Sequence, residues 1–142
     1  MADLDLFQTS LFVTTHDQGL HDITSSLTQA LARSKVRTGL CTVFVRHTSC
    51  SLLIQENADP TAKHDLERWL ARLAPEGDPR YTHTTEGDDD MPAHLRAAVT
   101  RTSEQMPIVD GRLGLGTWQG LYLWEHRHRG GRRELIVTAM GR

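Results

Sequence analysis

The most informative stretch of the sequence is residues 111–126, which read Gly-Arg-Leu-Gly-Leu-Gly-Thr-Trp-Gln-Gly-Leu-Tyr-Leu-Trp-Glu-His. The second half predicts a strand over 118–126 that ends on two ionisable side chains, Glu125 and His126. The four glycines of this stretch argue for bulges or close backbone approach, because glycine weakens an ordinary strand. A loop containing Gly130-Gly131 joins this strand to another predicted strand over 134–139.

The elements that precede this stretch do not alternate regularly between strands and helices. The pattern predicts a strand over 4–15, a helix over about 21–34 with Asp22 as candidate N-cap, and strands over 40–46 and 51–54. Asp59-Pro60 opens the clearest helix, which ends before Pro75. A long loop over 74–91, a short helix over 92–99 and a strand end with a turn over 107–111 follow. A doubly wound sheet would alternate, so we expect an α+β fold with antiparallel sheets.

Size and composition limit the classes of protein that this chain can belong to. Its 142 residues predict a single domain over 1–142, and a formal net charge of -2 argues against nucleic-acid binding. No segment approaches the roughly 18 consecutive apolar residues of a membrane span, and the N-terminus lacks the basic region of a signal peptide. Cys41 and Cys50 alone are weak evidence for a disulfide. We therefore expect a cytoplasmic protein with reduced thiols and no membrane partner.

Two predicted strand ends carry candidate catalytic side chains. His47 follows one strand and precedes the small polar residues 48–51, and histidine can act as acid, base or metal ligand near neutral pH. A surface histidine at a turn explains His47 equally well. Glu125 alternates with leucines, so it should lie on an apolar face, where desolvation raises a carboxyl pKa and suits acid–base catalysis. His126 falls on the opposite face, so the two side chains should not act together.

Further polar and basic residues are candidates for binding a substrate. Asn57 lies just before Asp59, the expected helix cap, and has no such ready structural role of its own. Trp118, followed by Gln119, could wall an aromatic pocket, although burial in the core is the commoner fate of a tryptophan. The arginines between 127 and 133, together with Arg112, offer a phosphate-binding surface, because arginine pairs with phosphate oxygens in a fork. The alternative is a hairpin tip that only promotes solubility.

Histidines flank the acidic loop over 86–90. His83 precedes this loop and His94 follows it, and Asp90 and His94 are four residues apart, which would put them on one face of a helix. Two histidines with nearby carboxylates suit a divalent metal such as zinc, although the spacing is not that of a standard zinc motif. The alternative is a solvated acidic loop with an incidental histidine at each end.

Three blocks of sequence, taken in order, resemble the YjbQ family, whose members are often called secondary thiamine-phosphate synthases. The resemblance covers nearly the whole chain. The motifs that carry it are His47-Thr48-Ser49, Glu56-Asn57-Ala58-Asp59-Pro60, His83, Gly87-Asp88-Asp89, Met91-Pro92-Ala93-His94, Gly116-Thr117-Trp118-Gln119 and Glu125. The resemblance implies mostly antiparallel sheets packed in a sandwich-like core, two or three flanking helices, and a homotrimer.

The resemblance also implies an activity and a set of site residues. The expected enzyme is a transferase that joins a pyrimidine pyrophosphate to a thiazole phosphate and releases pyrophosphate, either as its main activity or only as a secondary one. The expected catalytic residues are His47, Asn57 and Glu125. The expected substrate-binding residues are Ser49, Arg112, Trp118, Gln119 and Arg127. A divalent metal, zinc or magnesium, would be held by His83, Asp88 and His94.

Two departures from the family pattern and two other functions remain open. Asp90 stands where the family is expected to favour Asn, which makes the loop more negative, and His126 stands where many members carry an aromatic residue. One alternative function is a metal-dependent hydrolase of a small phosphorylated or acylated molecule. The other is a non-catalytic ligand-binding protein.

Overall fold

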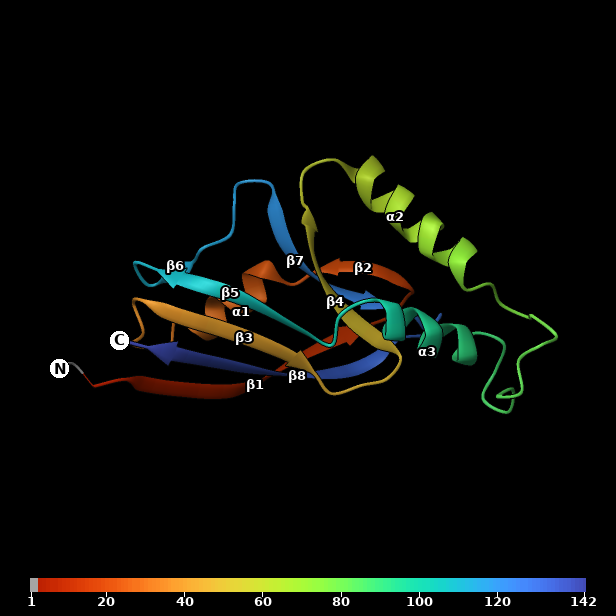
Figure 1. Cartoon of the computed structure of the whole chain (residues 1–142), viewed down its shortest axis with the longest axis horizontal. Coiled ribbons are helices and arrows are strands. Elements are labelled where there is room, and N and C mark those ends of the chain that lie inside the picture. The colour runs from red at the N-terminus through yellow and green to blue at the C-terminus, as the bar shows by residue number, and fades with distance from the viewer. Residues whose placement is uncertain (1–2) are drawn as a thin grey trace.

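Two antiparallel sheets face each other in the computed structural model, which describes residues 3–142 (Figure 1). The larger sheet has the strand order β1 (Asp5–Thr15), β8 (Gly131–Gly141), β3 (Gly39–Val45), β5 (Ser103–Val109) and β6 (Arg112–Leu113). The smaller sheet has the order β2 (Gly19–Asp22), β7 (Gln119–Glu125) and β4 (Cys50–Glu56). The expected α+β fold with antiparallel sheets in a sandwich-like core is confirmed.

The main core fills the space between the two sheets. Alternate residues of β3 and β8 point inward, including Val43 and Val137, and they meet Leu52 and Leu123 of the smaller sheet. All four of these side chains are 0% exposed. Burial of this apolar surface, at roughly 25 cal/mol per Å², is the main force that holds the sheets together.

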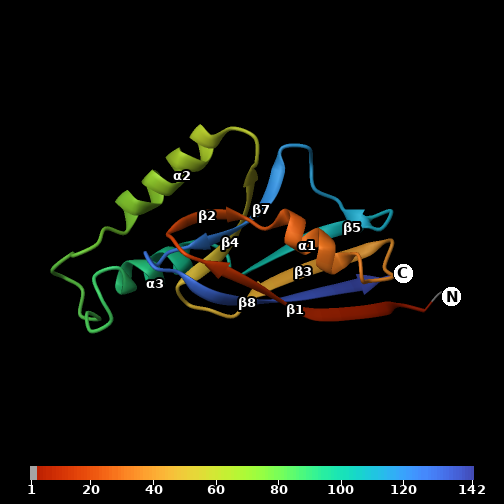
Figure 2. The ribbon, with the colours of Figure 1, turned by 180° about the vertical axis from the view of Figure 1, so that it is seen from behind.

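Three helices are present between residues 3 and 142, and each covers a different part of the sheets. α1 (Thr24–Leu31) inserts Leu27 and Leu31 into the main core and lies over the larger sheet in the rear view (Figure 2). α2 (Pro60–Leu73) places Leu70 against Trp124 on the outer face of the smaller sheet. α3 (Asp90–Val99) packs beside β4. No helix in this part of the chain is long and apolar enough to cross a membrane.

The predicted elements were located well where the local signal was strong. Asp59 caps α2 as expected, and its side chain accepts a hydrogen bond from the Thr61 amide. The predicted helix over 21–34 was wrong at its start, because His21 belongs to β2, which pairs with β7. Asp22 is not the N-cap residue of α1, although its carboxylate accepts from the Thr24 amide. A short edge strand cannot be recognised until its partner is known.

The hairpin between β5 and β6 was only half predicted. Its turn falls at Asp110 and Gly111, whose φ values of 51° and 78° match the type I′ geometry of tight hairpins. β5 begins at Ser103, four residues before the predicted strand end, and β6 is a two-residue strand that the sequence did not indicate.

Candidate functional site

Strand ends that are distant in sequence meet at one end of the sandwich. Cys50 at the start of β4 pairs with Glu125 at the end of β7, and Thr15 at the end of β1 pairs with Gly131 at the start of β8. The turn after β3 carries residues 47–49 to the same place. The antiparallel register therefore brings together the sequence blocks 47–49 and 125–133. α3 lies at this end of the molecule (Figure 1).

Glu125 is fully buried and forms an ion pair with Arg133. Its carboxylate accepts hydrogen bonds from Arg133 Nε at 2.7 Å, from the Arg133 Nη2, from the Thr15 hydroxyl and from the Arg127 amide at 3.1 Å. Burial raises the pKa of Glu125, but the hydrogen bonds from Arg133 and Thr15 outweigh it and leave the pKa below its usual value. The predicted rise in this pKa is therefore wrong.

This pairing gives Glu125 the geometry of a positioning residue. Its carboxylate stays ionised and is saturated by donors, so it has little capacity left to accept a proton from a substrate. It holds Arg133 in place, and Arg133 in turn donates to the Ser49 hydroxyl at 3.1 Å. Arg133 lies close to Glu125 in the sequence, but Thr15, the other side-chain donor, is 110 residues away, so no local pattern could identify it.

His47 is held in one tautomer by the backbone. Its Nε2 accepts from the Glu134 amide at 2.8 Å, so in the neutral ring the proton must reside on Nδ1. Burial and the positive charge of Arg133 lower the pKa of His47, which favours that neutral ring. Arg133 Nη1 and His47 Nδ1 are 3.5 Å apart, and two donors cannot form a hydrogen bond. His47 thus offers a fixed N–H donor, and its basic nitrogen is already occupied.

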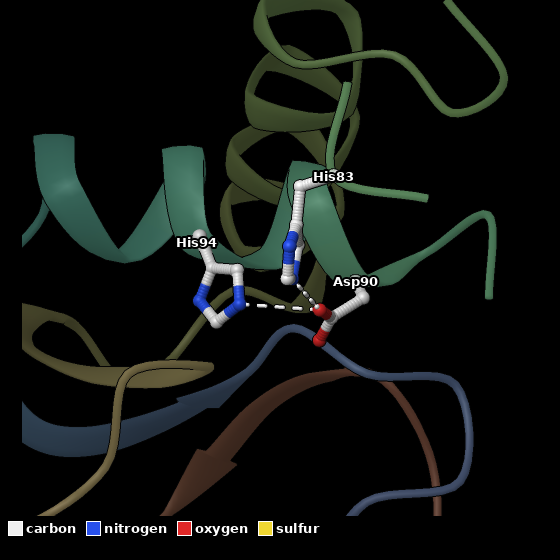
Figure 3. A group of neighbouring side chains, drawn as sticks. All are labelled: His83, Asp90 and His94. Atoms are coloured by element: carbon white, nitrogen blue, oxygen red, sulfur yellow. Dashed lines mark hydrogen bonds and ion pairs between the residues drawn. The ribbon is translucent and has the colours of Figure 1, made fainter. Parts of the chain in front are cut away.

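The strongest candidate for metal binding is a cluster of His83, Asp90 and His94 (Figure 3). His83 comes from the loop between α2 and α3, Asp90 is the first residue of α3, and His94 lies one turn further on. Asp90 Oδ2 is 2.7 Å from His83 Nε2 and 3.2 Å from His94 Nε2. The candidate ligand atoms all lie within 4.8 Å of one another.

The tautomer of His94 argues for a cation in this cluster. His94 Nδ1 lies 2.9 Å from the Thr48 carbonyl oxygen, which can only accept, so Nδ1 carries a proton. In the neutral ring the lone pair of Nε2 would then face the Asp90 carboxylate, which is unfavourable. Either protonation of the ring or a metal ion removes that conflict. A histidine whose second nitrogen donates to a backbone carbonyl is also the usual arrangement of a metal ligand.

The donor set suits zinc better than magnesium. Two imidazole nitrogens and one carboxylate oxygen are common zinc ligands and would leave a coordination position open, whereas magnesium prefers oxygen donors. Asp90 takes the place expected for Asp88, which is exposed and is not part of the cluster. The spacing of four residues between Asp90 and His94 was the signal for this, since it puts both on one face of α3.

A basic cavity of about 570 Å³ lies beside this cluster. It is lined by Ser49, Asp89, Arg127, His128, Arg129, Gly130 and Arg133. Three arginines and one carboxylate give it a positive balance, which suits an anionic group. Ser49 and Arg127, two of the expected substrate-binding residues, both line this cavity.

A second cavity, also of about 570 Å³, has a more apolar lining. His47 and His94 line it together with Phe44, Val45, Ala97 and Ala98. The metal-binding candidate His94 therefore belongs to the wall of this cavity. His83 and Asp88 line a smaller third cavity of about 230 Å³.

Four expected site residues lie elsewhere. Asn57, Trp118 and Gln119 gather at the opposite end of β7 from Glu125, and a strand of this length spans about 20 Å. Asn57 Nδ2 donates to the carbonyl oxygens of Thr117 and Gln119, so it has the structural role that the sequence did not reveal. The Trp118 side chain is exposed. Arg112 lies on the edge strand β6, at the end of the molecule away from α3 (Figure 1).

Relatives of this chain are found in bacteria and archaea. Residues 9–142 match the family model described as UPF0047 protein YjbQ-like, and the chain belongs to this family. The UPF0047 protein sll1880 of Synechocystis sp. is 58% identical over 134 residues, which cover 94% of this chain and 91% of that protein. The UPF0047 protein YjbQ of Escherichia coli O157:H7 is 40% identical, with coverage of 95% and 98%.

Solved structures have the same architecture. A YbjQ-like protein of Sulfolobus solfataricus superposes with a TM-score of 0.90 over 99% of this chain and 100% of that one, at 24% identity, which shows the shared fold. The conserved hypothetical protein TT1486 of Thermus thermophilus gives a TM-score of 0.79 at 38% identity, with coverage of 90% and 97%.

Proposed function

We propose that this protein is a metal-dependent enzyme that acts on a small phosphorylated molecule. The observation that carries the proposal is the convergence of His83, Asp90 and His94, whose candidate ligand atoms lie within 4.8 Å of one another. A backbone carbonyl fixes the His94 ring so that its Nε2 faces this cluster. The basic cavity next to this cluster would receive the phosphate group. A divalent metal bound here would polarise a phosphoryl oxygen and neutralise developing negative charge.

The other side chains would bind and orient the substrate. Arg133, held by Glu125, would present a fixed guanidinium to the phosphate, and the Ser49 hydroxyl would donate a hydrogen bond to a phosphate oxygen. His47 would donate a hydrogen bond to the substrate from Nδ1–H, because its Nε2 is occupied by the Glu134 amide. These roles require donors in fixed positions, which is how proteins stabilise phosphoryl groups during transfer.

The reaction that we propose first is a thiamine-phosphate synthase-like transfer, whether it is the main activity or a secondary one. A pyrimidine pyrophosphate would join a thiazole phosphate, and pyrophosphate would leave. Two cavities of similar volume, one basic and one more apolar, favour a reaction with two substrates. His94 lines the apolar cavity and contacts Asp90, which also pairs with Arg127 of the basic cavity.

Hydrolysis of a phosphorylated or acylated molecule is the second candidate. The observation that favours it is the set of three protein ligands, which leaves a coordination position for water, as in many hydrolytic zinc sites. A non-catalytic ligand-binding role would use the same cavities without turnover.

The experiment begins with the metal content of the purified protein and of His83→Ala and His94→Ala variants. Each protein then receives either the pyrimidine pyrophosphate with the thiazole phosphate, or p-nitrophenyl phosphate, in the presence of Zn²⁺ or Mg²⁺. Metal-dependent formation of thiamine phosphate that the variants lose supports the transferase. Metal-dependent release of nitrophenol alone supports the hydrolase. Metal binding without any turnover supports the ligand-binding role, and absence of metal binding contradicts the proposal.

We also propose that the protein assembles as a homotrimer through the outer face of the larger sheet. Large apolar side chains are exposed there across adjacent strands: Leu6 (71%), Met140 (49%), Leu40 (40%) and Phe44 (47%). Such a patch is typical of a protein interface. Light scattering coupled to size-exclusion chromatography would give the mass of the assembly, and a monomeric mass near 16.0 kDa would contradict this assignment.

A cytoplasmic location is proposed from the two thiols. Cys41 and Cys50 are free and buried, and burial raises the pKa of the first to about 11 and of the second to about 12. Free thiols are typical of proteins kept in a reducing compartment.

A further inference from the structure

The Asp90 carboxylate connects the metal-binding cluster to the basic cavity. Its Oδ2 faces His83 and His94, whereas its Oδ1 accepts a hydrogen bond from Arg127 Nη1 at 2.6 Å. Asp90 is only 2% exposed, so solvent does little to screen either interaction. One buried carboxylate therefore serves a candidate metal ligand set and an arginine of the cavity wall at the same time.

Arg127 lines the cavity, but the loop over 86–90 occupies three of its donors. Its Nε donates to Asp89 at 3.1 Å, its Nη1 donates to Asp90, and its Nη2 donates to the Glu86 carbonyl at 2.9 Å. With these bonds in place, the guanidinium has few donors left for an anion in the cavity. The Arg127 side chain is nevertheless 29% exposed, so it has room to change its contacts.

A metal ion on the cluster would weaken the bond between Asp90 and Arg127. The metal would share the negative charge of Asp90, and it would repel the guanidinium from a distance of a few ångströms. Arg127 would then gain free energy by turning a donor toward an anion in the cavity. A bound phosphate would in turn reduce the repulsion between the metal and Arg127.

We infer that metal and phosphate bind with positive coupling, and that Asp90 and Arg127 carry this coupling. The inference rests on the proposed function and adds the way in which the two halves of the site communicate. The ligand class is a phosphate dianion, bound in the basic cavity by Arg127, Arg129 and Arg133. Coupling is reciprocal, so each ligand must tighten the other by the same factor, and couplings between sites are commonly about 5–150-fold. We expect a factor of about ten.

The test is a set of calorimetric titrations on the full chain, with Co²⁺ as the metal and phenylphosphonate as an inert phosphate-like dianion. Phenylphosphonate affinity is measured without and with saturating Co²⁺, and Co²⁺ affinity without and with phenylphosphonate, after correction for direct binding between the two. The visible spectrum of Co²⁺ reports its coordination independently. Arg127→Gln removes the link to Asp90, and Arg129→Gln is the matched control, because it removes a charge from the same cavity without touching Asp90.

We expect each ligand to tighten the other about tenfold in the parent chain and in Arg129→Gln. In Arg127→Gln we expect a clearly smaller factor, because only the direct attraction between the metal and the dianion remains. Arg127→Lys, which keeps the charge but not the fork, should show a reduced factor and serves if the glutamine variant does not fold. Co²⁺ and phenylphosphonate that bind independently in the parent chain would overturn the inference and leave the proposed function intact. Equal coupling in Arg127→Gln and the parent would also overturn it. A chain that does not bind Co²⁺ would contradict the proposed function itself.

Discussion

Glu125 and Asp90 are both almost fully buried carboxylates paired with an arginine, yet their surroundings give them different roles. Glu125 lies at the end of a core strand and accepts hydrogen bonds from Arg133, Thr15 and the Arg127 amide. Asp90 lies at the start of a helix that follows a long loop, and one of its oxygens faces two imidazole nitrogens. Burial of a carboxylate therefore does not identify a catalytic residue. The free or occupied state of its lone pairs is the better guide.

The largest expected difference between the two carboxylates is in folding stability. Glu125→Gln should lower the free energy of unfolding by about 3–5 kcal/mol, because it leaves the buried Arg133 charge without its partner. Asp90→Asn should lower it by about 1–2 kcal/mol, because Arg127 is more exposed and keeps its bonds to Asp89 and Glu86. Urea denaturation at pH 7 with a chelator present measures both. Equal losses would contradict the distinction between a core pair and a ligand site.

The second-largest effect is expected on metal affinity, and it tests the assignment of Asp90 rather than Asp88 as the carboxylate ligand. His94→Ala should weaken Co²⁺ or Zn²⁺ binding by at least about 100-fold, since loss of a ligand exceeds the effect of losing its hydrogen-bond partners. Asp88→Ala is the control and should leave the affinity unchanged, because that side chain is exposed and lies outside the cluster. Competition with a chromophoric chelator gives both affinities. A loss in Asp88→Ala as large as that in His94→Ala would return Asp88 to the ligand set.

A smaller effect is the pH dependence of folding stability, which tests the buried histidines near Glu125. Burial lowers the pKa of His126 to about 3, and burial also lowers the pKa of His47. The unfolded chain, with a histidine pKa near 6.5, therefore binds more protons than the folded chain between about pH 6.5 and pH 3, so stability falls as the pH falls. The lowered pKa of Glu125 adds a further loss only below about pH 4.5.

We expect the free energy of unfolding to be about 1–2 kcal/mol lower at pH 5 than at pH 7. His126→Gln should remove most of this slope, because it removes the more strongly shifted of the two histidines. Denaturation curves at pH 7, 6 and 5 measure it. The same slope in the parent and the variant would show that the buried ring is not its source.

The smallest effects are expected at the distant end of β7. Asn57→Ala should lower the free energy of unfolding by less than about 1 kcal/mol, since it removes two hydrogen bonds to an exposed loop. Neither this change nor Trp118→Ala should alter the affinity for Co²⁺ or phenylphosphonate. Calorimetry on both variants checks this. A loss of ligand affinity in Trp118→Ala would mean that this end of a neighbouring copy completes the site, and the separation seen within one chain would not describe the assembly.

Local sequence signals located most of the elements and part of the site. The Asp-Pro pair at 59–60 correctly predicted the start of α2, and the apolar run over 118–126 predicted β7. Strand alternation with Leu121 and Leu123 put Glu125 on the core side of β7. The same alternation correctly put His126 on the other face, where its ring packs against Trp124 with centroids 5.6 Å apart. The spacing of Asp90 and His94 indicated the cluster, although Asp88 was the predicted carboxylate ligand.

Features that depend on near neighbours along the chain could be predicted without a structure. These are strand alternation, helix caps, the i and i+4 spacing, and membership of the YjbQ-like family through its motifs. Three features became visible only in the folded chain: Thr15 and Arg133 saturate the Glu125 carboxylate, Asn57 and Trp118 lie far from His47, and Asp90 contacts both the histidines and Arg127. The physical reason is that these contacts depend on strand register and loop path, which bring together residues up to 110 positions apart. Which charges are paired and which side chains are buried depends on these distant partners, so no local sequence pattern predicts either property.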